Sequence, residues 1–375
     1  MADADVSELL TAMHRIDVLR LSEEHKHELK VATSALSLAL ETPWEVTMRI
    51  VWQEPSVHAC ICTLIDLEVF KRWVAECEEV RSCQELAELV GCDSRLMNRL
   101  LRNLASNGLL VNCGSQNYAM TEFTRSLAQT KHIAAFSYFR NLHLPMLTAL
   151  PTYLASTKYQ DSFLKHPTST AFNQALGTKD GLFDYLSKHP DQERDFGHCM
   201  EAVSGSVPSW IEIYPTESSL VKSDGQRDDV VVVDVGGSIG HDLNAFQRKH
   251  RLQPGRLVLQ DLAEVLEGAR VESGITKMPH DFFTDQTVEG KFHPYIVIYS
   301  QQKGRSKILI HEIIVGRQSD SKMATWMDIT MLAAFNSGER SFEQWEAIVT
   351  GADMRISDIR NSCGTPYSIL ELELA

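Results

Sequence analysis

Three aspartates and a glycine-rich turn in the second half of the chain could hold a ligand. The stretch 230–240, VVVVDVGGSIG, sets four β-branched residues before Asp234. Such a run suits a buried parallel strand better than a helix. Gly236, Gly237 and Gly240 would let the strand turn sharply into a helix while the backbone comes close to a ligand. Asp234 is therefore expected at the carboxyl end of a strand, where open α/β sheets bind ligands.

Two further acids follow the turn at nearly constant spacing. Asp261 lies 21 residues after Gly240, and Asp281 lies 20 residues after Asp261. An acid about 20 residues beyond a glycine turn is placed to accept hydrogen bonds from both hydroxyls of a ribose. The turn, D-x-G-x-S-x-G, departs from the G-x-G-x-x-G of dinucleotide sites. The pattern predicts a nucleotide or a nucleoside-bearing cofactor.

The residues around these acids alternate between strand and helix patterns from residue 230 onward, which predicts a Rossmann-like α/β domain over 221–375. After the first strand we expect strands in RLVLQDL (256–262), at the end of KMPHDFF (277–283), and in HPYIVIYS (293–300), KILIHEIIV (307–315) and YSILELEL (367–374). Helices are expected at about 322–335 and about 341–351.

The first 125 residues predict a mainly helical domain that ends in a winged helix. CQELAELVG (83–91) and DSRLMNRLLRNLASNG (93–108) are two short helices, and LLVNCGSQNYAMT (109–121) is a two-stranded wing. A winged helix can bind DNA or serve as a structural or dimerising module. We favour the second because the chain is acidic. Residues 126–220 are expected to be a helical linker that lines a substrate pocket.

Composition limits the classes of partner. The net charge of −14 does not suit a phosphate backbone, so no nucleic acid is expected. No stretch approaches the roughly 18–20 apolar residues of a membrane span, and the acidic first residues are unlike a signal peptide. The eight cysteines form no C-x-x-C pair, which predicts neither a metal site nor disulfides. A cytoplasmic protein is expected.

Several motifs together resemble one known family. DVGGSIGHDLNAF, LVLQDLAEV, MPHDFFTDQ, ILIHEIIV, WMDITML, GERSFEQW and LETPWE are similar to segments of the fungal S-adenosylmethionine-dependent O-methyltransferases. These share their plan with the plant caffeate-type enzymes. The resemblance covers nearly the whole chain, including the winged helix, which is a dimerisation module in that family. It implies a class I methyltransferase fold, S-adenosylmethionine as cofactor and a homodimer.

The resemblance also assigns roles to residues. Gly236, Gly237 and Gly240 would line the methionine part of the cofactor beside Asp234. Asp261 would bind the ribose with Leu262 packed next to it. Asp281 and Phe282 would flank the adenine. Ser238 stands where the family usually has glycine.

The residues that would act on the methyl acceptor match the family less completely than those that would bind the cofactor. Methyl transfer to a hydroxyl needs a base that removes the hydroxyl proton. The family uses the histidine of an HDW motif, and this chain has no HDW. Its two supporting carboxylates are matched by Glu312 and Glu339, the expected catalytic residues. The histidines that could replace the base are His143, His198, His293 and His311.

The connection where HDW is missing is also too short for the expected topology. If 293–299 and 307–315 are adjacent parallel strands, only seven residues, 300–306, join them. A parallel crossover needs roughly 10–12 residues or more. Either one strand assignment is wrong, or the sheet is rearranged, or the chain has lost a segment, as it would if a gene model had dropped part of an exon.

The family's acceptor pocket is apolar and helical. Its expected lining residues here are Phe139, Phe172, Met200 and Met331, with Phe196, Met327 and Phe335 as further candidates. Aromatic and methionine side chains at helical spacing are also typical of an ordinary core. The leading hypothesis is an O-methyltransferase acting on an aromatic or polyketide-type hydroxyl of a small molecule in secondary metabolism. The alternative is a protein that binds the cofactor without methylating, such as a pericyclase, a dehydratase or an inactive partner.

Overall fold

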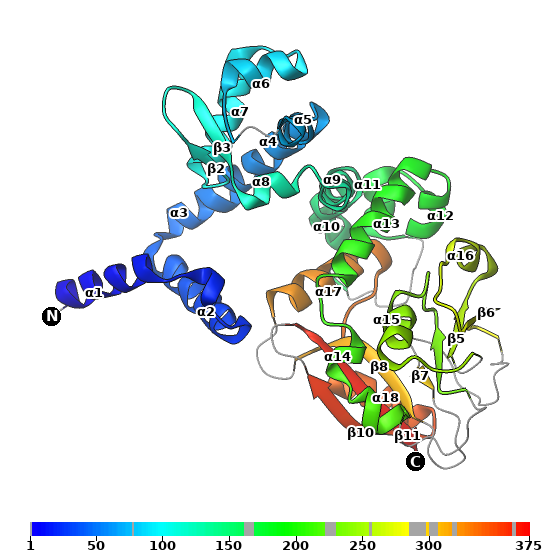
Figure 1. Cartoon of the computed structure of the whole chain (residues 1–375). Helices are drawn as coiled ribbons and strands as arrows, with labels where there is room; N and C mark the ends of the chain where they lie inside the picture. Colours follow the sequence, from blue (N-terminus) through cyan, green and yellow to red (C-terminus); the bar gives the residue numbers. More distant parts are fainter. Residues whose placement is uncertain are drawn as a thin grey trace. The chain divides into compact units, whose positions relative to one another are not determined.

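Contacts within the chain divide it into two units, Met1–Ile133 and Ala134–Ala375 (Figure 1). The predicted domain boundaries near residues 125 and 220 stay predictions. The computed structural model describes residues 2–76, 79–160, 169–221, 230–254, 257–284, 298–299, 307–316, 321–361 and 365–375.

The first unit is mainly helical. Its elements are α1 (Ala2–Arg15), η1 (Val18–Arg20), α2 (Glu23–Leu40), α3 (Pro43–Met48), η2 (Arg49–Gln53), α4 (Glu54–Asp66), α5 (Val69–Ala75), β1 (Val80–Ser82), α6 (Cys83–Val90), α7 (Ser94–Ser106), β2 (Leu110–Asn112), β3 (Asn117–Met120) and α8 (Glu122–Ser126). Among the helices that the structure describes, none is both long enough and apolar enough to cross a bilayer.

The predicted winged helix is confirmed, and capping side chains set its helix ends. Ser82 accepts a hydrogen bond from the Glu85 N–H, and the Glu85 carboxylate accepts one from the Ser82 N–H, so α6 begins there. Asp93 caps α7, because its Oδ1 accepts a hydrogen bond from the Leu96 N–H at 2.9 Å. Strands β1, β3 and β2 form an antiparallel sheet in that order, and the wing turns between β2 and β3.

The second unit carries the sheet and the helices around it. From α9 onward the elements are α9 (Thr130–Tyr138), η3 (Phe139–His143), α10 (Leu144–Ser156), α11 (Ala171–Leu176), α12 (Leu182–Ser187), α13 (Pro190–Ser204), α14 (Trp210–Ile213), η4 (Glu217–Val221), β4 (Val232–Val235), α15 (His241–His250), β5 (Leu257–Asp261), α16 (Ala263–Gly268), β6 (Ile275–Pro279), β7 (Ile298–Tyr299), β8 (Ile308–Val315), α17 (Lys322–Phe335), β9 (Arg340–Ser341), α18 (Phe342–Gly351), β10 (Met354–Asn361) and β11 (Tyr367–Leu374). The predicted mixed α/β fold is confirmed, although β10 was not predicted.

The strands form one sheet in the order β6, β5, β4, β7, β8, β11, β10. Strands β4, β5 and β6 are parallel, as the sequence predicts. One face of the sheet packs on α14 and α15, where the rings of Trp210 and Phe246 stack with centroids 5.5 Å apart. The other face packs on α18 through Trp345 and Val349. Apolar side chains of β4 and β5 are thus buried on both faces, as is typical of parallel strands covered by helices.

Strand β7 runs antiparallel to both of its neighbours, β4 and β8. This corrects the expectation of adjacent parallel strands and shows that the sheet is rearranged at this strand. An antiparallel pair can be joined by a short loop, so the seven residues 300–306 are long enough. Residues 293–297, which complete the predicted strand, lie outside the described part of the chain. Because β7 is reversed, β8 still runs parallel to β4, and the carboxyl ends of both strands meet at the same edge.

A buried hydrogen-bond network ties the end of α17 to α10. The Tyr153 hydroxyl donates to Asn336 Oδ1 at 2.8 Å, and Asn336 Nδ2 donates to the Ser169 carbonyl at 2.9 Å. Asn336 is fully buried and ends α17 in the left-handed conformation, with φ of 50°. This position of α17 sets where the following residues, including Glu339, meet the sheet.

We predict that this network is coupled. Tyr153→Phe should lower the free energy of unfolding by about 1–2 kcal/mol, because it removes a buried hydrogen bond. Asn336→Ala should lower it by about 2–3 kcal/mol, since it adds left-handed strain to the lost bonds. Urea unfolding of both variants and of the double variant measures the coupling. Tyr159→Phe, at a side chain 75% exposed, is the control. Strictly additive losses would contradict the network.

Candidate functional site at the carboxyl edge of the sheet

The turn after β4 depends on its glycines. Gly236 and Gly240 have φ of 70° and 82°, in the left-handed region that favours glycine. At Gly237 a Cβ would lie 2.5 Å from the Asp234 carboxylate and 2.6 Å from Leu259, so no other residue fits without movement. The predicted sharp turn into α15 is therefore present.

Ser238 adopts the left-handed conformation, with φ of 53°, where the family usually has glycine. That strain is offset locally, because its backbone N–H donates to Asp261 Oδ2 at 2.8 Å. The other carboxylate oxygen of Asp261 accepts from the Leu262 N–H, also at 2.8 Å. Each oxygen keeps one lone-pair direction for a further donor, and Asp261 is half-buried. This carboxylate is held rigidly at the carboxyl end of β5, with the 44% exposed Leu262 beside it.

Asp234 lies on the sheet face that α15 covers and is 4% exposed. Burial, together with the charges of Asp242 and Asp261, raises its pKa to about 7. Within the part of the chain that the structure describes, the charges that shift the pKa of this carboxyl group are those of two other acids. A cationic group of a ligand would relieve this repulsion.

The third predicted acid lies next to the second. The His280 N–H donates to the Asp261 carbonyl at 2.9 Å, which brings the residues after β6 to the end of β5. Asp281 is exposed, and its carboxylate accepts from the Phe283 N–H at 2.9 Å. Phe282 is half-buried, and its ring edge would lie 4.0 Å from a Cβ at Gly236. Phe283, which the sequence did not single out, is 75% exposed and offers a second apolar ring.

Glu312 and Glu339 lie close together at the end of β8. Strand β9 (Arg340–Ser341) pairs with β8 at Ile314 and Val315, which brings Glu339 to the end of β8, near enough for the charge of Glu312 to act on it. Burial raises the pKa of Glu312. Burial, together with the charges of Glu312 and Asp328, raises the pKa of Glu339 to about 7. The sequence therefore identified two carboxylates that share an electrostatic environment.

Three further residues belong to this environment and were not predicted. Asp328 on α17 accepts a hydrogen bond from the Glu339 N–H at 2.8 Å, which fixes the backbone of the loop. The guanidinium of Arg340 acts against the rise in the pKa of Glu339. Burial raises the pKa of the Tyr367 hydroxyl, and the charges of Glu312 and Glu339 raise it further. No local sequence signal joins these residues, because they come from three separate elements.

The histidines differ in where they lie. His311 is adjacent to Glu312 in sequence, yet alternation along β8 puts its side chain on the opposite face. There it is 9% exposed, contacts the Tyr367 ring at 5.2 Å between centroids, and burial lowers its pKa. His198 faces Glu201 on α13, with 3.6 Å between Nδ1 and Oε2. His293 lies outside the described residues.

His143 lies in the helical part of the second unit. It closes the π-helical turn η3, which ends two residues before Pro145. Proline lacks an N–H and clashes with the carbonyl four residues earlier, and a π turn relieves both problems. The His143 ring contacts Phe139 at 5.0 Å and bonds the Thr330 hydroxyl of α17 at 3.3 Å. Burial lowers its pKa, so the neutral form is favoured at pH 7.

The predicted pocket residues fall in the same helical cluster, with different exposure. Phe139, Met200 and Met331 are half-buried. Phe172 is only 1% exposed and packs edge-on against Tyr185, so in this structure its ring is part of the core. Their roles in substrate binding stay predictions.

The glycine turn and its acids fit S-adenosylmethionine. Gly236 has no side chain, so a ligand can come close to the protein backbone there. The rigid Asp261 carboxylate can accept hydrogen bonds from the two hydroxyls of a ribose. The acid-rich surroundings of Asp234 suit a cation, and Leu262, Phe282 and Phe283 offer apolar surface for a flat ring. These features lie at the carboxyl ends of three adjacent strands.

Comparisons with known proteins point to one group. Residues 55–130 match the family model of the O-methyltransferase dimerisation domain. The chain is 30% identical over 362 residues to O-methyltransferase mfmE of Annulohypoxylon moriforme, covering 92% of this chain and 89% of that protein. It is similar, at TM-score 0.85 and 26% identity, to a solved structure described as a pericyclic reaction enzyme, covering 99% of this chain and 100% of the other. The solved complex of LepI with S-adenosylmethionine gives the same TM-score and identity, with 100% of both chains covered.

Gly237→Ala tests the turn. The added methyl group would contact the Asp234 carboxylate and Leu259, so we expect the free energy of unfolding to fall by about 1–3 kcal/mol. Thermal or urea unfolding measures this loss. Gly268→Ala is a matched control, because a Cβ there would meet nothing within 4 Å. Equal stability of the two variants would show that the turn is not packed as described.

Proposed function

Since this chain belongs to the fungal class I S-adenosylmethionine O-methyltransferase family, we propose that it binds S-adenosylmethionine and methylates a hydroxyl of a small molecule. The acceptor is of the aromatic or polyketide type found in secondary metabolism. The observation that carries the proposal is the set of three acids at the ends of β4, β5 and β6 around a glycine turn. The matched dimerisation region supports a homodimer.

In this proposal the residues of the turn hold the cofactor. Asp261 accepts from both ribose hydroxyls with Leu262 packed beside it, and Asp281 and Phe282 flank the adenine. Gly236, Gly237 and Gly240 allow the backbone to follow the methionine part, and Asp234 faces its cationic end. LepI, 26% identical over the whole chain, was crystallised with the same cofactor. When bound, the cofactor supplies an electrophilic methyl group.

The acceptor hydroxyl must lose its proton, and we propose that Glu339 takes it. A base is most effective when its pKa lies near the working pH, and burial and neighbouring acids raise the pKa of Glu339 to about 7. The charges of Glu312 and Asp328 raise the pKa of Glu339, and the charge of Arg340 lowers it. The carboxylate thus replaces the histidine of the absent HDW motif. Phe139, Met200 and Met331 would orient the acceptor, and His143 would line the same pocket.

Asp261→Asn tests the cofactor site. Loss of the charged acceptor should weaken binding of S-adenosylhomocysteine roughly 10- to 100-fold, as measured by calorimetry. Glu264→Gln, an exposed acid on the neighbouring α16, should leave affinity unchanged and serves as the control. If Asp261→Asn binds as tightly as the wild type, the ribose assignment is wrong.

Glu339→Gln tests the proposed base. Turnover of labelled S-adenosylmethionine against a panel of phenols should fall about 100-fold, with little change in stability. The wild-type rate should rise as pH increases through about 7, because Glu339 accepts a proton only when ionised. The rate of the variant should lose this dependence. If His143→Gln, and not Glu339→Gln, abolishes the pH dependence, His143 is the base.

A second candidate function is supported by one specific observation. The reversed strand β7 and the missing HDW motif alter the segment that carries the family's base, while the cofactor acids are retained. One similar solved structure is described as a pericyclic reaction enzyme. This protein would then bind the cofactor and catalyse a reaction without methyl transfer. Tight binding of S-adenosylmethionine with no labelled product from any acceptor in the panel would favour this candidate.

A further inference from the structure

Tyr367 lies at the carboxyl edge of the sheet, beside the two carboxylates Glu312 and Glu339. Strand β11 begins at Tyr367 and runs antiparallel to β8, so the start of β11 lies where β8 ends. Tyr367 pairs with Ile313, the residue after Glu312. Strand β9 pairs with β8 from Ile314 onward, which brings Glu339 to the same place. Three segments that are far apart in the sequence therefore bring a phenol and two carboxyl groups together.

Packing against His311 holds the ring of Tyr367. Paired residues of two antiparallel strands project to the same face, and alternation along β8 puts His311 on the face of Ile313, the partner of Tyr367. The two rings contact each other with centroids 5.2 Å apart and planes inclined by 48°. His311 is buried, whereas Tyr367 is half-buried. The ring of Tyr367 is thus supported from the protein side and keeps some accessible surface.

The hydroxyl of Tyr367 has no hydrogen-bond partner among the residues that the structure describes. Outside the strand ladder, the one hydrogen bond that Tyr367 makes there runs from its backbone N–H to Thr365 Oγ1 at 3.3 Å. The hydroxyls of Tyr118, Tyr153 and Tyr214, by contrast, each donate to another side chain at 2.7–2.9 Å. A tyrosine hydroxyl that is partly buried usually has a partner, so a ligand is expected to supply it here.

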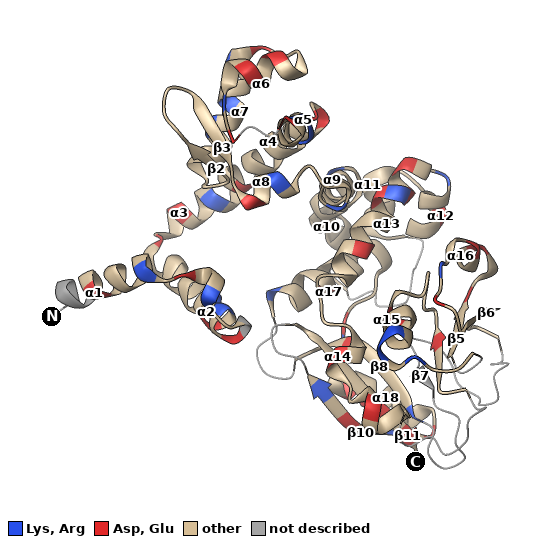
Figure 2. Cartoon of the chain, in the orientation of Figure 1, with Lys and Arg blue, Asp and Glu red and all other residues tan. Residues whose placement is uncertain are grey.

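The charges around this hydroxyl keep it a donor. Burial raises the pKa of the Tyr367 hydroxyl, and the charges of Glu312 and Glu339 act in the same direction. The hydroxyl therefore keeps its proton at neutral pH. Acids outnumber bases in the whole chain by 50 to 36 (Figure 2), and around Glu339 the acids Glu312 and Asp328 are offset by Arg340. A ligand oxygen at this edge meets several groups that accept hydrogen bonds and few that donate them.

An acceptor hydroxyl that loses its proton among acids needs a donor as well as a base. When Glu339 takes the proton, the O–H bond breaks and its electron pair stays on the acceptor oxygen. Negative charge then builds on that oxygen until its bond to the methyl carbon forms, and the neighbouring carboxylates oppose this charge. A fixed donor close to the oxygen stabilises the charge without reorganisation. Tyr367 can do so and still keep its own proton.

We propose that the Tyr367 hydroxyl donates a hydrogen bond to the acceptor oxygen and stabilises the negative charge that forms on it, which makes Tyr367 a catalytic residue. This inference rests on the proposed function and adds a second group to the base Glu339. It also restricts the acceptor to an acidic hydroxyl, that of a phenol or an enol. A carboxylate base and one neutral donor are too weak to ionise an aliphatic alcohol, which is far less acidic.

Tyr367→Phe removes the hydroxyl and keeps the ring on His311. Turnover of labelled S-adenosylmethionine with the phenol that the wild type uses best should fall about 100-fold. Urea unfolding and the affinity for S-adenosylhomocysteine should not change, because the hydroxyl bonds nothing in the described chain. Tyr159→Phe, at a side chain 75% exposed, should leave all three measurements unchanged. Wild-type turnover in Tyr367→Phe, with or without a loss of stability, would overturn the proposal.

Binding of 4-nitrophenol, whose absorbance changes when it ionises, tests the contact without methyl transfer. With S-adenosylhomocysteine present, the bound phenol should ionise about 1 pH unit higher in Tyr367→Phe than in the wild type, a tenfold loss of affinity for the phenolate. Equal ionisation in both proteins, or no binding to the wild type at about 1 mM, would overturn the inference.

The two measurements separate this inference from the proposed function. If the shift in ionisation is present but no phenol is methylated, the proposed methyl transfer fails and the donor role of Tyr367 stands. If phenols are methylated and the shift is absent, the donor role alone fails.

Discussion

The packing of Gly237 against Asp234 and Leu259 is the constraint on which the site depends. There is no room for a Cβ at this position, and glycine has none. The chain can therefore leave β4 and enter α15 within a few residues, and the ends of β4 and β5 come close enough for the Ser238 N–H to reach Asp261. The His280 N–H then holds the next segment to Asp261. Three carboxylates from distant parts of the sequence thus meet at one edge of the sheet.

Burial of a carboxyl group close to other acids is the common electrostatic feature of both parts of the site. Burial and neighbouring carboxylates raise the pKa of Asp234 and of Glu339 to about 7. Because these values lie above the ordinary ones, the stabilising contribution of the neutral forms is fully present at low pH and is lost as pH rises toward and through 7. The folded protein therefore gives up stability near neutral pH to keep ionisable carboxylates at the edge of the sheet. In the proposed function, this arrangement favours a cationic ligand at one end and a proton acceptor at the other.

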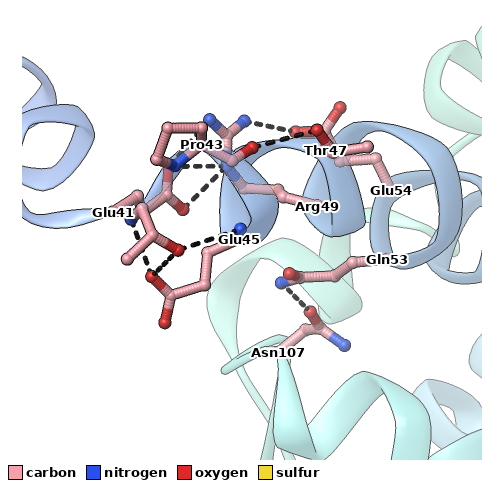
Figure 3. Close-up of polar contacts among 9 residues, drawn as sticks. Glu41, Pro43, Glu45, Thr47, Arg49, Gln53, Glu54 and Asn107 are labelled. Carbon is pink, nitrogen blue, oxygen red and sulfur yellow. Dashed lines mark hydrogen bonds and ion pairs between the residues drawn. The ribbon is translucent and has the colours of Figure 1, made fainter.

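The first unit combines a well-packed part and an uncovered part. Its winged helix has a dense core in which Trp73, Leu86, Met97 and Leu101 are completely buried. Residues 6–53 have no buried side chain among those described, and Arg49 bonds Glu41 and Glu54 where they meet α4 (Figure 3). The match of residues 55–130 to the O-methyltransferase dimerisation domain agrees with the expectation, from the acidity of the chain, that the winged helix is a dimerising module and not a DNA-binding one.

The sequence by itself determined the features that depend on neighbouring residues. The β-branched run before Asp234, the glycines after it and the capping residues Ser82 and Asp93 act within a few positions, so strand, turn and helix ends followed from residue types. The spacing of Asp261 and Asp281 followed from the repeating strand–helix unit.

Only the tertiary structure decided what depends on contacts between distant segments. The direction of β7 is set by its pairing with β4 and β8, and the strand is too short for its sequence to reveal that direction. Alternation along β8 separates His311 from Glu312, while Asp328 and Tyr367 join the carboxylates from other elements. Phe172 matched a pocket pattern but is buried, because an apolar periodicity does not say whether a side chain faces a ligand or the core. Such choices depend on long-range packing, which no local pattern encodes.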